Sequence, residues 1–382
     1  MATAMINIGL LRLTDAAPVV VAFEKGFFDR RDLVVRLSVE PSWANIADKL
    51  SYGRLQAAVM LPPLAFAIAL GTRGISVPLI VPMGLSLNGN SVTVAAEIAR
   101  DLALPPSADA SEAGARLRGF IQRRGRRLRL AVVHLHSTHN LLLRYWLAAC
   151  GIDPVRDIDF SVVPPAETAD ALLDGLIDGF CAGAPWGEVA ARAEVGATIV
   201  TSSQIWHNHP EKCLAVSAGW AERQPRLLDG MLDALIEAAR FCDAPENAEE
   251  VAALLSEDRY LHLKPSLIRA SLPQATRGDR SNVDRSVFFA HAANFPWRSQ
   301  AAWFLNEMTR WNLLDRDVDR DAAAAIYRPD LFREAAARNG IAAPPADAKA
   351  EGAHAAQWTI ETRPFPIAMG PDSFFDGTVF AP

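Results

Sequence analysis

Short apolar stretches of strand length alternate with amphipathic stretches of helix length over the first half of the chain. This order predicts a parallel sheet with crossover helices, because two parallel strands must be joined by a long connection. The alternation runs through two successive series, which predicts two α/β lobes. Strands are expected at 6–11, 33–37, 57–60, 77–81 and 91–95 in the first lobe, and at 129–133, 158–163, 179–182 and 198–201 in the second.

Capping residues mark the ends of the intervening helices. Ser42 is placed to cap a helix that runs through Leu50, and Pro62 suits the first turn of a helix that ends at Gly71. Beyond Lys212 the chain is expected to turn helical, at 218–242, 244–256, around 267, 300–312 and 319–337, and to cover the first lobe. The predicted division is 1–98 for lobe I, 99–208 for lobe II, 209–342 for a return to lobe I, and 343–382 for an irregular strap packed by its phenylalanines.

The balance of charge and apolar residues excludes several classes of protein. The formal net charge is -6, which argues against an extended nucleic-acid surface. No segment has the roughly 20 apolar residues that a membrane-spanning helix needs, and the first residues lack the pattern of an export signal. A cytoplasmic location is therefore expected, without membrane contact. The 4 cysteines lack metal-type spacing and are expected to be reduced.

One stretch is strongly basic and runs from Arg123 to Arg129. An exposed helix end that leads into a strand would explain it. A contact for RNA or for an acidic partner is the alternative.

Side chains with hydrogen-bond donors lie where apolar strands end. Trp43, Asn90, His139 and Lys212 each lie beside a predicted helix start or turn. In open α/β sheets ligands bind outside the carboxyl ends of the strands, and the start of a helix attracts anions. The pattern predicts a pocket for a small anion.

Each of these residues also has a purely structural explanation. Trp43 could serve packing, Asn90 turn geometry, and His139 an ordinary helix start, while Lys212 could be a solvated surface charge. Gly183 could be a turn glycine, or its missing side chain could leave room for a ligand. Recognisable catalytic motifs are absent and the clustered histidines lack further metal ligands nearby in the sequence, so no enzyme activity, metal or cofactor is expected.

A series of motifs runs nearly end to end through the chain. They are Leu13-Thr14-Asp15-Ala16-Ala17-Pro18, Glu24-Lys25-Gly26-Phe27-Phe28, Ser42-Trp43-Ala44, Val81-Pro82-Met83, Leu87-Asn88-Gly89-Asn90, Ser137-Thr138-His139, Arg144-Tyr145-Trp146-Leu147-Ala148-Ala149, Asp178-Gly179-Phe180-Cys181, Pro185-Trp186, His209-Pro210-Glu211-Lys212 and Tyr327-Arg328-Pro329-Asp330-Leu331. In these motifs the chain resembles the nitrate- and bicarbonate-binding proteins of ABC transporters. The resemblance implies the two-lobe type II periplasmic-binding-protein fold, with a ligand cleft between the lobes.

The resemblance also implies a set of ligand-binding residues. These are Trp43, Asn90, His139, Gly183 and Lys212, and Asn90 departs from the glutamine of some transporter members. Nitrate has only acceptor oxygens and needs converging donors and one positive charge, whereas bicarbonate also needs an acceptor. The mapped positions include no carboxylate cluster, so nitrate or nitrite is the expected ligand.

Within that family the chain resembles the NasS-like cytoplasmic nitrate/nitrite sensors of bacterial nitrate assimilation. The resemblance implies a protein partner, a NasT-like antiterminator of the ANTAR type, which is sequestered without ligand and released when the anion binds. No direct nucleic-acid contact is implied. The alternatives are a transport binding protein whose export signal was removed, and an enzyme related to thiamine-pyrimidine synthases that uses Cys181. Lys212→Ala is expected to abolish the nitrate response and to leave the fold intact.

Overall fold

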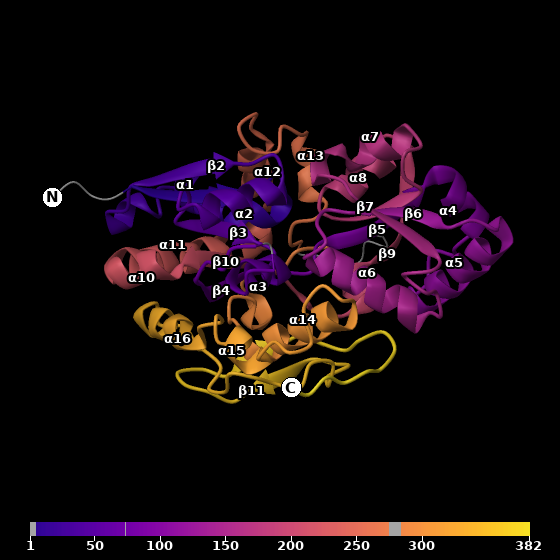
Figure 1. Ribbon diagram of the computed structural model, residues 1–382. Helices are drawn as coiled ribbons and strands as arrows, with labels where there is room; N and C mark the ends of the chain where they lie inside the picture. The colour runs from indigo at the N-terminus through magenta and orange to yellow at the C-terminus, as the bar shows by residue number, and fades with distance from the viewer. Residues whose placement is uncertain (1–4, 73, 275–283) are drawn as a thin grey trace.

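The computed structural model describes residues 5–72, 74–274 and 284–382. Figure 1 shows two α/β lobes side by side, with the C-terminal helices and strap below them in this view. Each lobe is built on one five-stranded sheet among the described residues. The expectation of two α/β lobes is confirmed.

The sheet of lobe I has the strand order β2-β1-β3-β10-β4. Its members are β1 (Ile6–Leu10), β2 (Val35–Val39), β3 (Ala57–Met60), β4 (Leu79–Leu87) and β10 (Pro210–Ser217). β1 runs parallel to β2 and β3, whereas β10 runs antiparallel to both β3 and β4. The sheet is therefore mixed, and the prediction of a parallel sheet is wrong for β10.

The sheet of lobe II has the strand order β7-β6-β8-β5-β9. Its members are β5 (Asn90–Ala95), β6 (Leu128–Val132), β7 (Ile158–Val162), β8 (Gly179–Gly183) and β9 (Gly196–Thr201). β6 is parallel to β7 and β8, and β5 is antiparallel to β8 and β9.

The chain crosses from lobe I to lobe II directly between β4 and β5. The crossing is the turn at Asn88 and Gly89, both of which have positive φ. We expected 91–95 to complete lobe I, but β5 lies inside the second sheet. In that sheet β5 runs antiparallel to β8, so the prediction of parallel strands is wrong for β5 as well. The apolar pattern of a short strand predicts that the segment is extended, but it does not indicate which sheet the strand will join.

The chain returns to lobe I through β10. We expected the region beyond Lys212 to be helical, but it continues as this strand to Ser217. All residues of β10 except the last are buried, so its sequence has no alternating polar face that would mark a strand.

The side-chain cap predicted at Ser42 is present, and Ser137 caps the start of another helix in the same way. The Oγ of Ser42 accepts from the backbone N–H of Asn45, and the Oγ of Ser137 accepts from that of Asn140. The helices around the two sheets are α1 (Ala17–Glu24), α2 (Trp43–Ser51), α3 (Pro62–Ala69), α4 (Ala96–Leu102), α5 (Ala110–Arg124), α6 (Thr138–Ala149), α7 (Thr168–Leu173), α8 (Trp186–Arg192), α9 (Ser202–Ile205), α10 (Ala218–Arg223), α11 (Pro225–Asp243), α12 (Ala248–Ser256) and α13 (Pro265–Arg269).

The C-terminal region contains α14 (Arg298–Arg310), α15 (Arg320–Ala324), α16 (Pro329–Arg338), β11 (Trp358–Ile360) and β12 (Ile367–Met369). The helix expected at 319–337 is interrupted before Pro329, and the one expected at 218–242 before Pro225, because a proline restricts the residue before it and lacks an N–H. The strap expected at 343–382 contains the antiparallel pair β11 and β12. The predicted domain boundaries stay a prediction.

The C-terminal region joins the two lobes. Helix α14 packs against α3 of lobe I and α6 of lobe II. The ring of Phe374 in the strap stacks on Trp206, with ring centroids 4.5 Å apart, and lies 5.3 Å from the ring of Tyr145 on α6. Phe374 is buried, as the strap prediction requires, whereas Phe365 is exposed.

Candidate functional site

The predicted site residues lie where the two lobes face each other. Trp43 begins α2 and His139 lies in the first turn of α6, each just beyond the end of a strand. Asn90 and Gly183 are paired opposite each other on β5 and β8, and Lys212 lies on β10. The side chains of Trp43, Asn90, His139 and Lys212 are all buried. Their contacts, described below, show that the fold brings the predicted residues together.

Lys212 is a buried ammonium group held by two carboxylates. Its Nζ lies 2.8 Å from Oδ2 of Asp15 and also contacts Oε1 of Glu211. The same Nζ lies 5.5 Å from the ring centroid of Trp43. Burial alone lowers the pKa of Lys212, but Asp15 and Glu211 outweigh it and raise that pKa above its usual value. Lys212 is therefore charged at neutral pH, and a solvated surface position is excluded.

Glu211 lies at the centre of a buried polar cluster and contacts Lys212, Asn90 and His139. Its Oε2 accepts from Nδ2 of Asn90 at 2.6 Å, and its Oε1 lies 3.5 Å from Nε2 of His139. Burial raises the pKa of Glu211, but Lys212, His139 and His209 lower it further than burial raises it, to about 2. Glu211 is therefore an anion at any ordinary pH.

Asp15 and Glu211 correct one sequence inference. We expected no carboxylate cluster at this site, but these two side chains flank the ammonium group of Lys212. Both lie inside quoted motifs, and the pair Glu211-Lys212 is consecutive. That adjacency was the available signal. In a strand consecutive side chains point to opposite faces, but the ladder of β10 shifts register at Lys212, and this irregularity accompanies their convergence.

His139 is a neutral imidazole within the site. Burial lowers its pKa to about 3, although Glu211 acts in the opposite direction. Neither ring nitrogen has a hydrogen-bond partner among the described residues. A neutral imidazole offers one N–H donor and one acceptor, so His139 can direct a hydrogen bond without adding charge.

Further polar atoms around Lys212 are buried without partners in the described part of the chain. They are the donor Nε1 of Trp43 and the acceptors Oδ1 of Asp15 and Oδ1 of Asn90. Buried polar groups are nearly always hydrogen-bonded in folded proteins. So many orphaned atoms around one ammonium group indicate a binding site for a small polar ligand.

Gly183 adds space rather than a side-chain contact. A Cβ at this position would lie 3.2 Å from Leu13 and 3.4 Å from both Asn90 and Asp15. A side chain at position 183 would therefore fill the space beside Asn90 and Asp15 and press on Leu13. This supports the interpretation in which the missing side chain of Gly183 leaves room for a ligand.

The lobes meet directly beside the cluster. Nε1 of Trp186 in lobe II donates to the carbonyl of Arg12 in lobe I at 3.0 Å. The backbone N–H of Thr14 donates to the carbonyl of Ala184 at 2.9 Å. Asp15 follows Thr14, so these bonds fix the loop that carries it against lobe II.

Other chemistries find little support in the described residues. No group of three or more His, Cys, Asp or Glu side chains there is arranged to hold a metal ion. The thiol of Cys181, the candidate nucleophile of an enzyme, is buried, and burial raises its pKa far above that of a reactive thiol. No helix in the described ranges is long and apolar enough to cross a membrane.

The basic stretch 123–129 lies at the opposite end of β6 from His139. Arg124, Arg126 and Arg129 converge on the carboxylate of Asp178, at 2.9, 3.4 and 2.9 Å. Beside them is a cavity of about 340 Å³ lined by Arg118, Ile121, Gln122, Gly125, Arg126, Arg127, Gly151, Ile152, Arg156 and Asp157.

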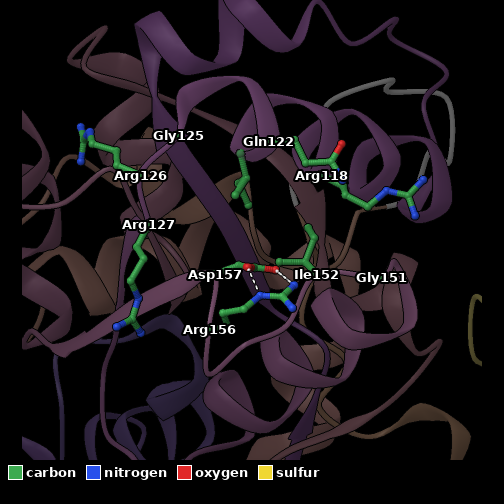
Figure 2. A pocket seen from close by; sticks show the side chains of 10 residues that line it. Arg118, Gln122, Gly125, Arg126, Arg127, Gly151, Ile152, Arg156 and Asp157 are labelled. Atoms are coloured by element: carbon green, nitrogen blue, oxygen red, sulfur yellow. Dashed lines mark hydrogen bonds and ion pairs between the residues drawn. The ribbon is translucent and has the colours of Figure 1, made fainter.

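The guanidinium groups around this cavity do not converge on one point. Figure 2 shows the side chains of Arg118, Arg126 and Arg127 pointing in different directions, while Arg156 lies against Asp157. Anion recognition needs donors that converge on one point. The cavity is therefore not built as an anion site. The pairing of Arg124, Arg126 and Arg129 with Asp178 supports the structural explanation of the stretch, and a contact for RNA or an acidic partner stays a prediction.

Comparisons with known proteins identify the family of the chain. Residues 2 to 256 match the NMT1-like family. The chain is 31% identical to the nitrate/nitrite binding protein NrtA of Synechococcus elongatus over 99% of this chain and 83% of that protein. It is 30% identical to the bicarbonate-binding protein CmpA of the same species, over 99% of this chain and 84% of that protein.

A solved structure and a longer relative complete the comparison. The periplasmic nitrate-binding protein NrtA of Synechocystis superimposes with a TM-score of 0.84 at 26% identity, covering 99% of this chain and 95% of that one. The two-lobe periplasmic-binding-protein fold expected from the sequence is thereby confirmed. The nitrate import ATP-binding protein NrtC of Synechocystis is 34% identical over 86% of this chain, which spans about half, 49%, of its length.

Proposed function

The chain belongs to the NMT1-like family and is homologous to nitrate- and bicarbonate-binding proteins, and from this premise we propose that it binds nitrate or nitrite between its lobes. It acts in this proposal as a binding protein and not as an enzyme. The observation that carries the proposal is the set of buried, unpartnered polar atoms around the ammonium group of Lys212.

The available donors suit a flat oxyanion. Lys212 supplies a full charge, and Nε1 of Trp43 and the ring of His139 supply neutral N–H groups from both lobes. Nitrate has three acceptor oxygens and no hydrogen to donate, so it can be held by such donors alone. Because the donors come from two lobes, the anion favours the closed arrangement in which they converge.

Hydrogencarbonate is a second candidate ligand, and a specific observation favours it. Oδ1 of Asp15 and Oδ1 of Asn90 are buried acceptors without partners. The hydroxyl group of hydrogencarbonate could donate to one of them. Isothermal titration with nitrate, nitrite and hydrogencarbonate separates the candidates in one series, and failure of all three to bind would overturn the proposal.

Trp43→Phe is expected to weaken nitrate binding by about 10- to 100-fold, because a hydrogen bond to a charged group contributes about 1.5–3 kcal/mol. The change keeps an aromatic ring beside Lys212 and removes the Nε1–H, which is otherwise unpartnered. Isothermal titration measures the effect. The matched control is Trp358→Phe, which removes an N–H that donates to Gly370 in the strap. Equal affinity in both variants would show that Trp43 does not touch the anion.

The regulatory part of the proposal rests on the resemblance of the motifs to the NasS-like sensors. In this proposal the protein works in the cytoplasm, sequesters a NasT-like antiterminator without ligand, and releases it when the anion closes the lobes. The alternative is a substrate-binding component of a nitrate or bicarbonate ABC transporter, which the names of the homologues favour.

Linkage gives a quantitative test of the sensor role. If the anion releases the partner, the partner must weaken anion binding by the same factor. A hundredfold coupling corresponds to about 2.7 kcal/mol. We expect nitrate titrations with and without the purified antiterminator to differ in Kd. Identical affinities would contradict the sensor role and leave the transport alternative standing.

A further inference from the structure

The ammonium group of Lys212 is already neutralised before any anion arrives. Asp15 and Glu211 both contact Nζ, and the two nearby imidazoles, His139 and His209, are neutral because burial lowers their pKa values. If Asp15 is ionised, the cluster carries a net charge of about -1. An oxyanion oxygen that faces Oδ1 of an ionised Asp15 with no hydrogen between the two atoms would be repelled.

The geometry of Asp15 offers a way to remove this repulsion. Only its Oδ2 contacts Lys212, at 2.8 Å, while its Oδ1 is buried without a partner in the described chain. A protonated carboxyl group is a hydrogen-bond donor as well as an acceptor. With a proton on Oδ1, Asp15 can accept from Lys212 and donate to an oxyanion at the same time.

We propose that Asp15 determines ligand specificity by admitting an oxyanion only together with one proton. This inference rests on the proposed function, since it concerns the same site. For an anion without hydrogen, such as nitrate, the proton comes from solvent and is held on Asp15. Hydrogencarbonate brings its own hydrogen, which Oδ1 of an ionised Asp15 can accept. In both complexes one hydrogen lies between Oδ1 of Asp15 and an oxygen of the ligand.

The surroundings of Asp15 favour its neutral form. Burial raises its pKa most, Lys212 lowers it, and Glu211 raises it again. Lys212 and Glu211, both on β10, are the charged groups that shift the pKa of Asp15 among the described residues. His139 on α6 and His209 in turn shift the pKa of Glu211. The pKa of Glu211 is lowered to about 2, that of His139 is lowered to about 3, and that of Lys212 is raised. Of the two carboxyl groups in this cluster, Asp15 is therefore the one whose surroundings favour a bound proton.

The sign of the pH effect follows from linkage. The complex with nitrate holds one more proton than the free protein whenever free Asp15 is ionised, so the affinity falls as pH rises. The fall is up to about tenfold per pH unit above the pKa of Asp15 in the free protein. It ends when pH exceeds the pKa of Asp15 in the complex.

The experiment is isothermal titration of the full-length protein with sodium nitrate between about pH 5.5 and 8.5, in paired buffers that differ in ionisation enthalpy. The buffers contain no small oxyanion. We expect the Kd for nitrate to rise with pH, and we expect the protein to take up as much as about one proton for each nitrate bound. For hydrogencarbonate we expect binding near neutral pH without proton uptake.

Two variants separate Asp15 from other buried carboxyl groups. Asp15→Asn keeps an acceptor for Lys212 and is expected to remove both the pH dependence and the proton uptake. Glu307→Gln is the matched control, because Glu307 on α14 is also buried with a pKa raised by burial, yet its partners are Arg310 and Trp311. It is expected to keep the wild-type pH profile.

The outcomes are distinct. Nitrate binding without pH dependence and without proton uptake in the wild-type protein overturns the role of Asp15, while the proposed function stands. Absence of binding by every oxyanion at every pH overturns the proposed function itself. The wild-type measurement needs no variant, so the inference stays testable if Asp15→Asn does not fold.

Discussion

Lys212→Ala is expected to weaken nitrate binding by about 100-fold or more and to destabilise the fold by about 3–5 kcal/mol. The sequence led us to expect loss of binding with an intact fold. The structure changes the second part, because Lys212 is buried between Asp15 and Glu211. Its removal leaves buried carboxylates without their cation. Isothermal titration and urea unfolding measure the two effects.

Lys25→Ala is the matched control for this prediction. Lys25 also pairs with a carboxylate, Glu250, but both side chains are partly exposed, at 27% and 51%. Exposed ion pairs contribute about 0–1 kcal/mol. We therefore expect a small change in stability and none in nitrate affinity. Wild-type nitrate binding by Lys212→Ala would show that the anion binds elsewhere.

The double variant Lys212→Met with Glu211→Gln distinguishes lost charge balance from lost packing. It removes the cation together with the carboxylate whose pKa is lowered to about 2, and Asp15 can then take up a proton. We expect part of the stability to return while nitrate binding stays absent. Stability as low as that of Lys212→Ala would mean that charge balance is not the main effect.

Phe374→Ala is expected to lower the free energy of unfolding by about 3–5 kcal/mol. Its ring lies in an aromatic cluster, with centroids 4.5 Å from Trp206, 6.1 Å from Trp303 and 5.3 Å from Tyr145. Removing the ring leaves a cavity between the strap, α6 of lobe II and α14. A shift of the urea midpoint with an unchanged m-value would show a loss of stability and not a change of the unfolded state.

Phe365→Ala provides the comparison within the same strap. Phe365 is 65% exposed, so its truncation is expected to change stability by no more than about 0.5 kcal/mol. The two variants differ in burial and not in chemistry. Equal effects would mean that Phe374 does not anchor the strap.

Much of the local structure was predictable from the sequence. The caps at Ser42 and Ser137 hydrogen-bond to the backbone three residues later, as their positions before apolar helices indicate. Strand ends also placed Trp43 and His139 at the edge where the lobes meet. The convergence of these residues with Asn90, Gly183 and Lys212 follows from motifs and strand ends together, and their contact with an anion stays a prediction.

The sequence by itself determined two α/β lobes, the starts of several helices, and the side chains at the ends of strands. Only the tertiary structure decided that β10 enters the first sheet between β3 and β4, and that β5 joins the second. These pairings join segments far apart in the chain, and local periodicity does not encode them. They also bring Asp15 against Lys212. The charge of a buried site depends on such distant neighbours, and for that reason its proton balance could not be read from the residues alone.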